Sequence, residues 1–417
     1  MSKMNSKLVL ARVLPLAMAL APSVASSAHA DTVTDWNAIM QSTVSVAPTN
    51  PNFQARWGAI TQLAVFEAVN SIVGDYEPYL GGIVAPAGAS PAAAAIAAAY
   101  RTLVTLRPGS IVALDAARAA SLLAIADGQA KDDGIAVGEA AAFAMLVLRA
   151  GDGWDAVVPY TPGTGPGDFQ PPPAGALLPG WGQVTPFGLV DGSQFRLQPP
   201  PALQTGKYAN DLNEIRLLGS FNSSLRPQDR TDVARFYAAA SPVQVFNSTA
   251  RQVSAAQGTS LSENARIFAL LGMAMCDASI ACWETKYQYN FWRPMAAIRA
   301  ADTDGNVLTD ADPTWLPLIT TPAHPSYASG HATVSGAARA VLERAFGKDG
   351  HAITLTTPTL PNIVLHYNAF DQITDDIDDA RIYGGIHFRF DQEAGARQGR
   401  QVGSYILRNY LRSEFDD

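Results

Sequence analysis

The longest helical pattern in the chain runs from Leu261 to Trp292, with the sequence LSENARIFALLGMAMCDASIACWETKYQYNFW. Its uninterrupted apolar run, residues 267–276, stops at Asp277 and falls short of the roughly 20 apolar residues that a membrane-spanning helix needs. We therefore expect no stable membrane anchor. Cys276 and Cys282 lie six residues apart, a spacing that points their side chains in different directions on a helix. They are predicted to be buried thiols and not a disulfide.

Helical patterns dominate the rest of the chain as well. An amphipathic pattern covers residues 56–73, and Pro91 can begin an alanine-rich helix that ends at Leu106, before Arg107-Pro108-Gly109. No convincing strand alternation or fixed-period repeat is found, so the predicted fold class is all-α, built of helical bundles. Further helices are predicted at residues 111–126, 135–149, 207–218, 228–240, 331–346 and 387–411.

One segment has a different composition. Residues 151–200 contain 10 Gly and 10 Pro, which excludes a regular helix. Five aromatic residues in this segment favour packing against a surface over a flexible linker, and the surface could belong to its own core or to a partner subunit. The chain is therefore divided into an N-terminal helical region (31–150), a Pro/Gly-rich connector (151–206) and a C-terminal helical region (207–417).

Residues 1–30 have the features of a secretory signal peptide. Positively charged residues precede the apolar run 13–21, and Ala28-His29-Ala30 is a small-x-small cleavage pattern before Asp31. We expect cleavage near Ala30 and a secreted or periplasmic protein.

The composition excludes several classes of protein. Apolar residues make up 48% of the 417 residues and charged residues 16%, against a usual share of roughly 25%, so a disordered chain is excluded. The net charge of −8 argues against a nucleic-acid partner, which would require a basic surface. Two cysteines exclude a disulfide scaffold and a four-cysteine zinc site. The oligomeric state stays open, a homo-oligomer included.

Three clusters could hold an oxyanion, and the first contains Lys286 and Arg293. These cations lie seven residues apart, so one continuous helix would project them from nearly the same face. Two stacked cations repel each other unless an anion lies between them. The alternative is a solvated lysine and an unrelated arginine, which the aromatic neighbours such as Trp283 and Trp292 disfavour.

The second cluster, Thr321 to His331, ends in Ser329-Gly330-His331 at the start of a small-residue helix. A helix N-terminus with free N–H groups, a hydroxyl and an imidazole can cradle an anion. Gly330 allows close approach of the backbone, and His331 can act as an acid or base near neutral pH. An ordinary serine N-cap with an incidental histidine is the alternative.

The third cluster runs from Arg381 to Asp391. Arg381 and His387 cannot share a face of one helix, but Gly384-Gly385 can break the helix and fold Arg381 back. Asp391 follows His387 by four residues and could orient its imidazole. Surface salt bridging is the alternative interpretation here. His351 and His366, outside the three clusters, are interpreted as structural or surface residues.

In this order, Lys-x6-Arg-Pro, Ser-Gly-His and Arg-x5-His-x3-Asp resemble the signature of the vanadium-dependent haloperoxidases, here of the bacterial secreted type. That family is similar in helical fold and site to the type-2 phosphatidic acid phosphatases and the bacterial class A acid phosphatases. The chain departs from the phosphatase-type motif at two positions beside ligands, where Ala328 replaces Pro and Ala380 replaces Ser.

The resemblance implies a vanadate cofactor, with His387 as the metal ligand. The vanadate oxygens would be bound by the side chains of Lys286, Arg293, Ser329 and Arg381 and by the N–H of Gly330. His331 would be the acid–base residue, so His331, His387 and Lys286 are the implied catalytic residues. Hydrogen peroxide, a halide and a small organic molecule would be the substrates.

Two neighbouring residues bear on the choice of chemistry. By resemblance, Trp283 would lie beside a halide pocket, and His324 stands where bromoperoxidases carry His and the chloroperoxidase type carries an aromatic residue. Bromide or iodide is therefore favoured over chloride. Phosphate could occupy the same site, which leaves an exported acid phosphatase acting through a phosphohistidine at His387 as an alternative. A non-enzymatic anion-binding protein is a third, which the intact ligand set disfavours.

Overall fold

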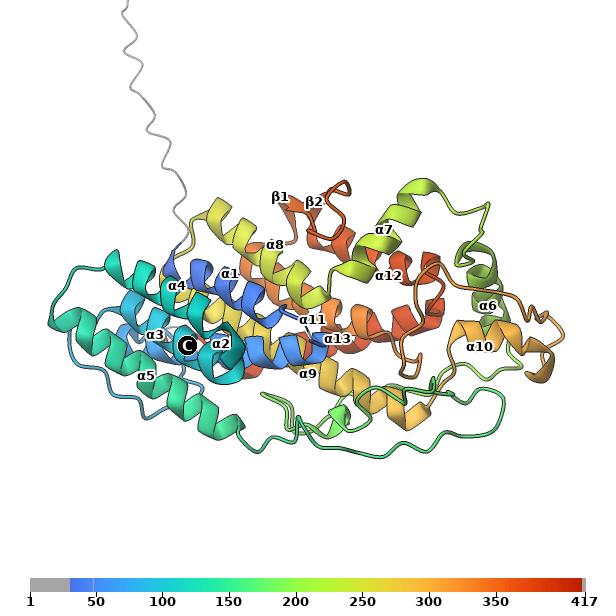
Figure 1. The fold of residues 1–417 in the computed structure, drawn as a ribbon, viewed down its shortest axis with the longest axis horizontal. Helices are drawn as coiled ribbons and strands as arrows, with labels where there is room; N and C mark the ends of the chain where they lie inside the picture. Colours follow the sequence, from blue (N-terminus) through green and yellow to red (C-terminus); the bar gives the residue numbers. More distant parts are fainter. Residues whose placement is uncertain (1–30, 48, 415–417) are drawn as a thin grey trace, which may run out of the picture.

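The computed structural model describes residues 31–47 and 49–414, so the predicted signal peptide lies outside the described residues. The described chain is mostly helical, as the sequence predicts (Figure 1). The helices are α1 (Thr32–Val44), α2 (Pro51–Val73), α3 (Pro91–Leu106), α4 (Ile111–Leu123), α5 (Gln129–Arg149), α6 (Gly206–Leu218), α7 (Gln228–Ala239), α8 (Pro242–Gln257), α9 (Leu261–Tyr289), α10 (Pro294–Arg299), α11 (Gly330–Phe346), α12 (Phe370–Tyr383) and α13 (Arg389–Asn409). Short 3₁₀ helices are η1 (Pro108–Ser110), η2 (Trp181–Gln183) and η3 (Ala301–Thr303), and the strands are β1 (Asp349–Leu355) and β2 (Leu365–Ala369).

Helix α9 is the central core helix. Ser260 and Glu263 form a capping box at its start, which satisfies two backbone N–H groups that the first turn leaves unpaired. The helix packs against α2, α11 and α13, and Figure 1 shows it between the blue-to-green N-terminal helices and the red C-terminal ones. It is long and apolar enough to cross a membrane, yet 94% of its most apolar window is buried inside the protein, as in a core helix. Cys276 and Cys282 are both buried and free, as predicted.

The apolar core has two clusters. The larger one draws on side chains from α1 to α13, and the smaller one surrounds α6 and α10. Phe388 and Phe390 belong to the smaller cluster, where their rings stack with centroids 4.8 Å apart, and Phe291 packs edge-on against both. Aromatic packing therefore fixes the segments that directly follow Lys286 and His387.

The Pro/Gly-rich connector is bound to its own α9. Asp277 accepts backbone N–H bonds from Phe187 (2.7 Å), Gly188 (2.7 Å) and Leu189 (3.0 Å). Trp181 Nε1 donates to the Ser279 hydroxyl at 3.0 Å. Apart from η2 the connector contains no helix, because its prolines lack the N–H groups that a helix requires. Of the two surfaces considered above, the connector covers its own core.

Two local predictions are wrong. β1 and β2 form an antiparallel hairpin where no strand was predicted. The strand β1 is only seven residues long, and its inward positions include His351, which hides the alternation of buried Ile353 and Leu355. In addition, α8 and α12 were not predicted as helices. His351 bonds the Gly347 carbonyl and His366 bonds Thr354, so both histidines have structural roles, as interpreted.

Candidate active site

Lys286 and Arg293 converge by a route that differs from the prediction. Helix α9 ends at Tyr289, and Asn290 caps it in the left-handed conformation with a φ of 55°. Arg293 is extended at the N-cap of α10, because the following proline disfavours a helical conformation for the residue before it. The prediction that one continuous helix face projects both cations is therefore wrong. A turn between two helices brings them together.

The second cluster folds over these two cations. Lys286 Nζ donates to the carbonyls of Pro325 (2.8 Å) and Ser326 (2.9 Å), and Arg293 Nε donates to the His324 carbonyl (2.7 Å). Ser329 is the N-cap of α11, where its hydroxyl accepts from the Ala332 N–H. Lysine and arginine thus hold the loop that leads into the predicted anion cradle.

A turn at the end of α12 interrupts the helix between Arg381 and His387, as predicted, and Arg381 and His387 line the same cavity. Helix α12 ends at Tyr383, and Gly385 adopts a φ of 78°. A Cβ at Gly385 would lie 2.4 Å from the Gly219 carbonyl oxygen, so this turn requires glycine. Arg381, in the last turn of α12, donates from Nη1 to the Tyr237 carbonyl at 3.0 Å.

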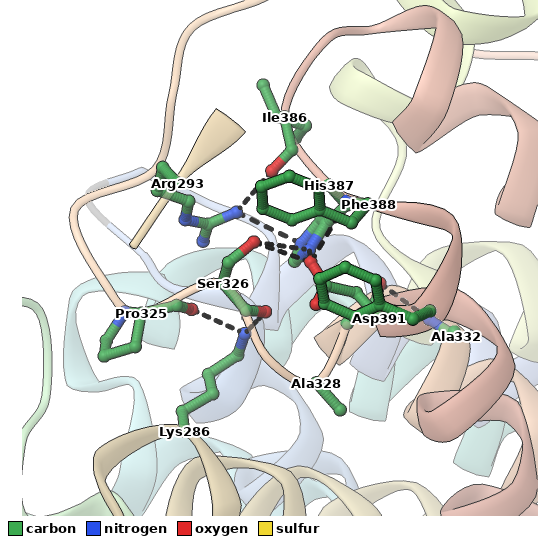
Figure 2. A network of polar contacts seen from close by, with 12 residues as sticks. Lys286, Arg293, Pro325, Ser326, Ala328, Ala332, Ile386, His387, Phe388 and Asp391 are labelled. Atoms are coloured by element: carbon green, nitrogen blue, oxygen red, sulfur yellow. Dashed lines mark hydrogen bonds and ion pairs between the residues drawn. The ribbon is translucent and has the colours of Figure 1, made fainter. Parts of the chain in front are cut away.

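His387 is held in a defined tautomer. Its Nδ1 donates to Asp391 Oδ2 at 2.8 Å, and the same carboxylate oxygen accepts from the Ser326 hydroxyl at 2.6 Å. Arg293 Nη1 lies 3.2 Å from Nε2 and can only donate, so Nε2 carries a lone pair. Figure 2 shows this network around the imidazole. Asp391 therefore orients the ring, as predicted, and leaves Nε2 in the form that binds a metal.

We call three buried side chains the cation cluster: Lys286, Arg293 and Arg381. Each is at most 4% exposed, and among residues 31–47 and 49–414 no ion pair joins them to a carboxylate. Burial lowers the pKa of Lys286, lowers that of Arg293 to about 10 and lowers that of Arg381 to about 9. Repulsion from Arg293 lowers the pKa of Lys286 and Arg381 further, whereas the nearby Asp391 carboxylate partly opposes the lowering at Lys286 and Arg293. Arg381 Nε has no hydrogen-bond partner. Uncompensated buried cations and an unpaired guanidinium donor are what a bound oxyanion would satisfy.

The other two histidines of the site, His331 and His324, lie close to the arginines of the cation cluster. His331 Nε2 lies 3.2 Å from the Tyr237 carbonyl, which also accepts from Arg381. The His324 ring packs on Trp283 with centroids 4.8 Å apart and accepts from Arg293 Nη2 at 3.0 Å. Burial, followed by the nearby arginines, lowers the pKa of His324, His331 and His387 well below the usual value. All three imidazoles are therefore neutral at neutral pH.

A cavity of about 220 Å³ opens onto these groups. Its walls include six of the predicted site residues: Trp283, His324, Gly330, His331, Arg381 and His387. Lys286, Arg293, Ser329 and Asp391 do not line it and lie in the layer behind, each contacting or adjoining a lining residue.

Sequence reasoning missed several contributors to the site. Ser326 lies inside the second cluster but received no role, although it bonds the carboxylate that orients His387. The Tyr237 carbonyl and the N-terminal turns of α2 and α8 also take part, and only the tertiary structure brings them to the cavity. Every residue has a backbone carbonyl, so the sequence contains no pattern that predicts which carbonyl takes part in a site.

Comparisons with known proteins find similarity to vanadium haloperoxidases. Residues 266–413 match a family model described as the second helical-bundle domain of VCPO. The vanadium chloroperoxidase of Curvularia inaequalis is 25% identical over 284 residues, which cover 52% of this chain. The alignment spans only 46% of that relative's own length.

Solved structures are similar over most of the chain. A bacterial vanadium-dependent iodoperoxidase has a TM-score of 0.77 and 25% identity, with 92% of this chain and 96% of that one covered. A holo-type bacterial vanadium-dependent chloroperoxidase has a TM-score of 0.72, 17% identity and coverage of 88% and 94%, a likeness of fold. The helical fold and the buried cation cluster define a class of helical-bundle protein with a site suited to an oxyanion. Within that class, this chain is similar in sequence and in fold to vanadium haloperoxidases.

Proposed function

We propose that this protein is a vanadium-dependent haloperoxidase, which uses hydrogen peroxide to oxidise a halide to a hypohalous species that halogenates small organic molecules. The observation that carries the proposal is the cation cluster, buried without an ion-pair partner in the described part of the chain beside His387, whose Nε2 carries the lone pair that a metal requires and accepts a hydrogen bond from Arg293 Nη1 at 3.2 Å. The activities in the names of the similar proteins support the same chemistry.

The residues present fit vanadate. The cation cluster would bind its oxygens together with the Ser329 hydroxyl and the Gly330 N–H, and His387 Nε2 would be the protein ligand of vanadium. When bound, vanadate supplies a Lewis acid that activates hydrogen peroxide toward halide. No group of three or more His, Cys, Asp or Glu side chains suited to a bare metal ion occurs among the described residues, and an oxyanion held by cations needs none.

His331 is the group that accepts and returns a proton. Its Nε2 hydrogen is fixed by the Tyr237 carbonyl, so Nδ1 of the neutral ring carries the lone pair. The lowered pKa keeps this nitrogen unprotonated at neutral pH, ready to take a proton from peroxide as it binds. Asp391 holds the hydrogen on His387 Nδ1 and so preserves the ligand tautomer throughout.

The halide preference that we propose is for bromide or iodide. His324 replaces a purely apolar aromatic side chain at the cavity wall, and it packs on Trp283. The iodoperoxidase name of one similar structure is consistent with this preference. We further propose that the protein acts after export, in the periplasm or outside the cell, following cleavage near Ala30.

The test begins with purified protein freed of bound anions by a chelator at mildly acidic pH. Orthovanadate is added back, and iodination or bromination of a phenolic dye is followed in the presence of peroxide. Activity that depends on vanadate and disappears in His387→Ala is expected. Hydrolysis of a phosphate monoester, with no vanadate-dependent halogenation at any tested halide, would instead establish the phosphatase alternative.

A further inference from the structure

Helix α5 carries an apolar stripe on its exposed side. The stripe consists of Ala136, Ala140, Phe143 and Val147, all of which are exposed in the described chain. Successive members are four, three and four residues apart, the spacing that puts side chains on one helix face and that contact positions of paired helices share. A groove of about 470 Å³ lies beside the stripe, between α5 and the outer side of α3. The stripe therefore has the form of a helix-packing surface.

Helix α4 adds to this apolar surface on the other side of α3. Only one of its 13 residues is buried. Its two charged side chains turn toward Tyr100 of α3, because Asp115 accepts from the Tyr100 hydroxyl at 2.6 Å and Arg118 lies 4.8 Å from the ring centroid. The next residue of α3, Arg101, pairs with Glu139 of α5, so α4 and α5 flank α3. Figure 1 shows both helices at the same end of the molecule.

The exposed apolar surface of α4 and α5 is large. Its largest side chains are between 46% and 86% exposed: Ile111, Val112, Leu123, Phe143, Val147 and Leu148. With the alanines between them they present on the order of 800 Å², about what each partner buries in a standard protein interface. The largest apolar patch on a typical monomer is roughly 300–600 Å². A patch of this size indicates a binding partner.

The order of small and large residues favours a second copy of this chain as that partner. The stripe has alanines in its N-terminal half and Phe143 and Val147 in its C-terminal half. When a two-fold axis is perpendicular to α5, the two copies of the helix are antiparallel. Phe143 then meets the partner's Ala140, and Val147 meets the partner's Ala136. Each large side chain is thus matched by a small one, as interdigitating helices require.

The charges near this surface disfavour a membrane as the partner. Acidic residues outnumber basic ones in residues 108–150. Helices that lie on a membrane surface are instead rich in Lys and Arg beside their apolar face. Repulsion from acidic lipids therefore opposes membrane docking, whereas a second copy needs only the apolar contact.

We propose that this protein forms a two-fold symmetric dimer in which the α5 stripes of two copies pack antiparallel, with α4 extending the interface. No residue of α4 or α5 is among those that line the candidate active-site cavity, so the interface and the cavity are separate. The dimer does not depend on the proposed haloperoxidase function, and its test needs no substrate.

The first test is sedimentation velocity of the purified protein, where a dimer is expected at about 10 µM. Phe143→Glu places one unpaired charge from each copy in the interface and should raise the dimer Kd at least about a hundredfold. Phe143 is exposed in a single copy, so the variant should keep the far-UV circular dichroism of the parent. The matched control is Val307→Glu, at a residue that is 97% exposed outside this surface, and it should leave the Kd unchanged.

The second test is cross-linking, which depends on the direction of pairing. A chain with both Ala136→Cys and Val147→Cys should form a covalent dimer under mild oxidation, because antiparallel pairing brings each position to the other position of the partner. The two positions are roughly 16 Å apart along one helix, too far for a disulfide within a chain. Each single variant is the control and should stay uncross-linked. The native Cys276 and Cys282 are buried and do not compete.

Three results would overturn the proposed dimer. The first is a parent protein that stays monomeric at about 100 µM. The second is a dimer that Phe143→Glu leaves intact, or a covalent dimer from either single cysteine variant, since both contradict antiparallel packing of the stripe. The third is binding of the parent to phospholipid vesicles that Phe143→Glu abolishes, which would assign the surface to a membrane.

Discussion

Two sets of buried cations in this molecule differ in what balances their charge. Arg56 and Arg149 both contact Asp152, with N···O distances of 2.8 Å, and all three side chains are at most 3% exposed. The cation cluster is as deeply buried, yet its hydrogen bonds go to carbonyls and imidazoles. In the first set the fold itself supplies a carboxylate, which balances one of the two positive charges. The second leaves its charge for a ligand, which distinguishes a structural ion pair from a binding site.

The largest effect is expected where the fold supplies the counter-charge. Asp152→Ala leaves two buried guanidinium groups unpaired and should lower the free energy of unfolding by about 3–5 kcal/mol. Urea denaturation measures the loss. The control is Asp127→Ala, since Asp127 is exposed and pairs only with Lys131, and it should change stability little. Equal stability of the two variants would contradict the structural role given to Asp152.

An added oxyanion should act on the cation cluster as Asp152 acts on its arginines. Orthovanadate at a hundred times its Kd should raise the free energy of unfolding by about 2.7 kcal/mol, and phosphate should do the same at its own Kd. Thermal unfolding at increasing anion concentration measures this. Arg381→Gln should lose most of the stabilisation while its anion-free stability stays near the parent value. A large loss of anion-free stability would show that Arg381 is structural.

A smaller effect is expected from pH in the anion-free protein. The folded-state pKa of Lys286 is lowered from 10.5 by burial, so the unfolded chain binds more protons between the two values. Stability should therefore rise as the pH increases from neutral toward 10, by about 1.4 kcal/mol for each unit of the shift. Denaturation at a series of pH values measures the slope. Lys286→Met should remove the slope below about pH 9, leaving the contribution of Arg381, whose pKa is lowered to about 9, and saturating oxyanion should remove the slope of the parent protein.

The smallest effect is expected at His324. His324→Phe should change the ratio of kcat/KM for bromide and iodide a few-fold and leave vanadate affinity largely intact, because the ring lines the cavity and does not belong to the cation cluster. Steady-state rates with each halide measure the ratio. An unchanged ratio would remove the reason for assigning halide preference to this residue.

Sequence reasoning succeeded where the signal is local. The helical pattern of residues 261–292 predicted the helix that the structure shows as α9, and the density of Pro and Gly after Gly151 excluded a helix there. Sequence reasoning failed where two residues have helical spacing but a turn lies between them. Lys286 and Arg293 have helical spacing, but Asn290 in the left-handed conformation and the proline after Arg293 end one helix and begin another.

By itself the sequence determined the helical fold class, the three motifs and the order of His387 and Asp391, because residue types and their spacing along the chain express these directly. Only the tertiary structure decided that the three cations lie buried with no ion pair among the described residues, that the Tyr237 carbonyl bonds His331, and that the first turn of α2 lines the cavity. The reason is physical. Burial and unsatisfied hydrogen bonds arise from packing between segments far apart in the chain, and no local pattern records them.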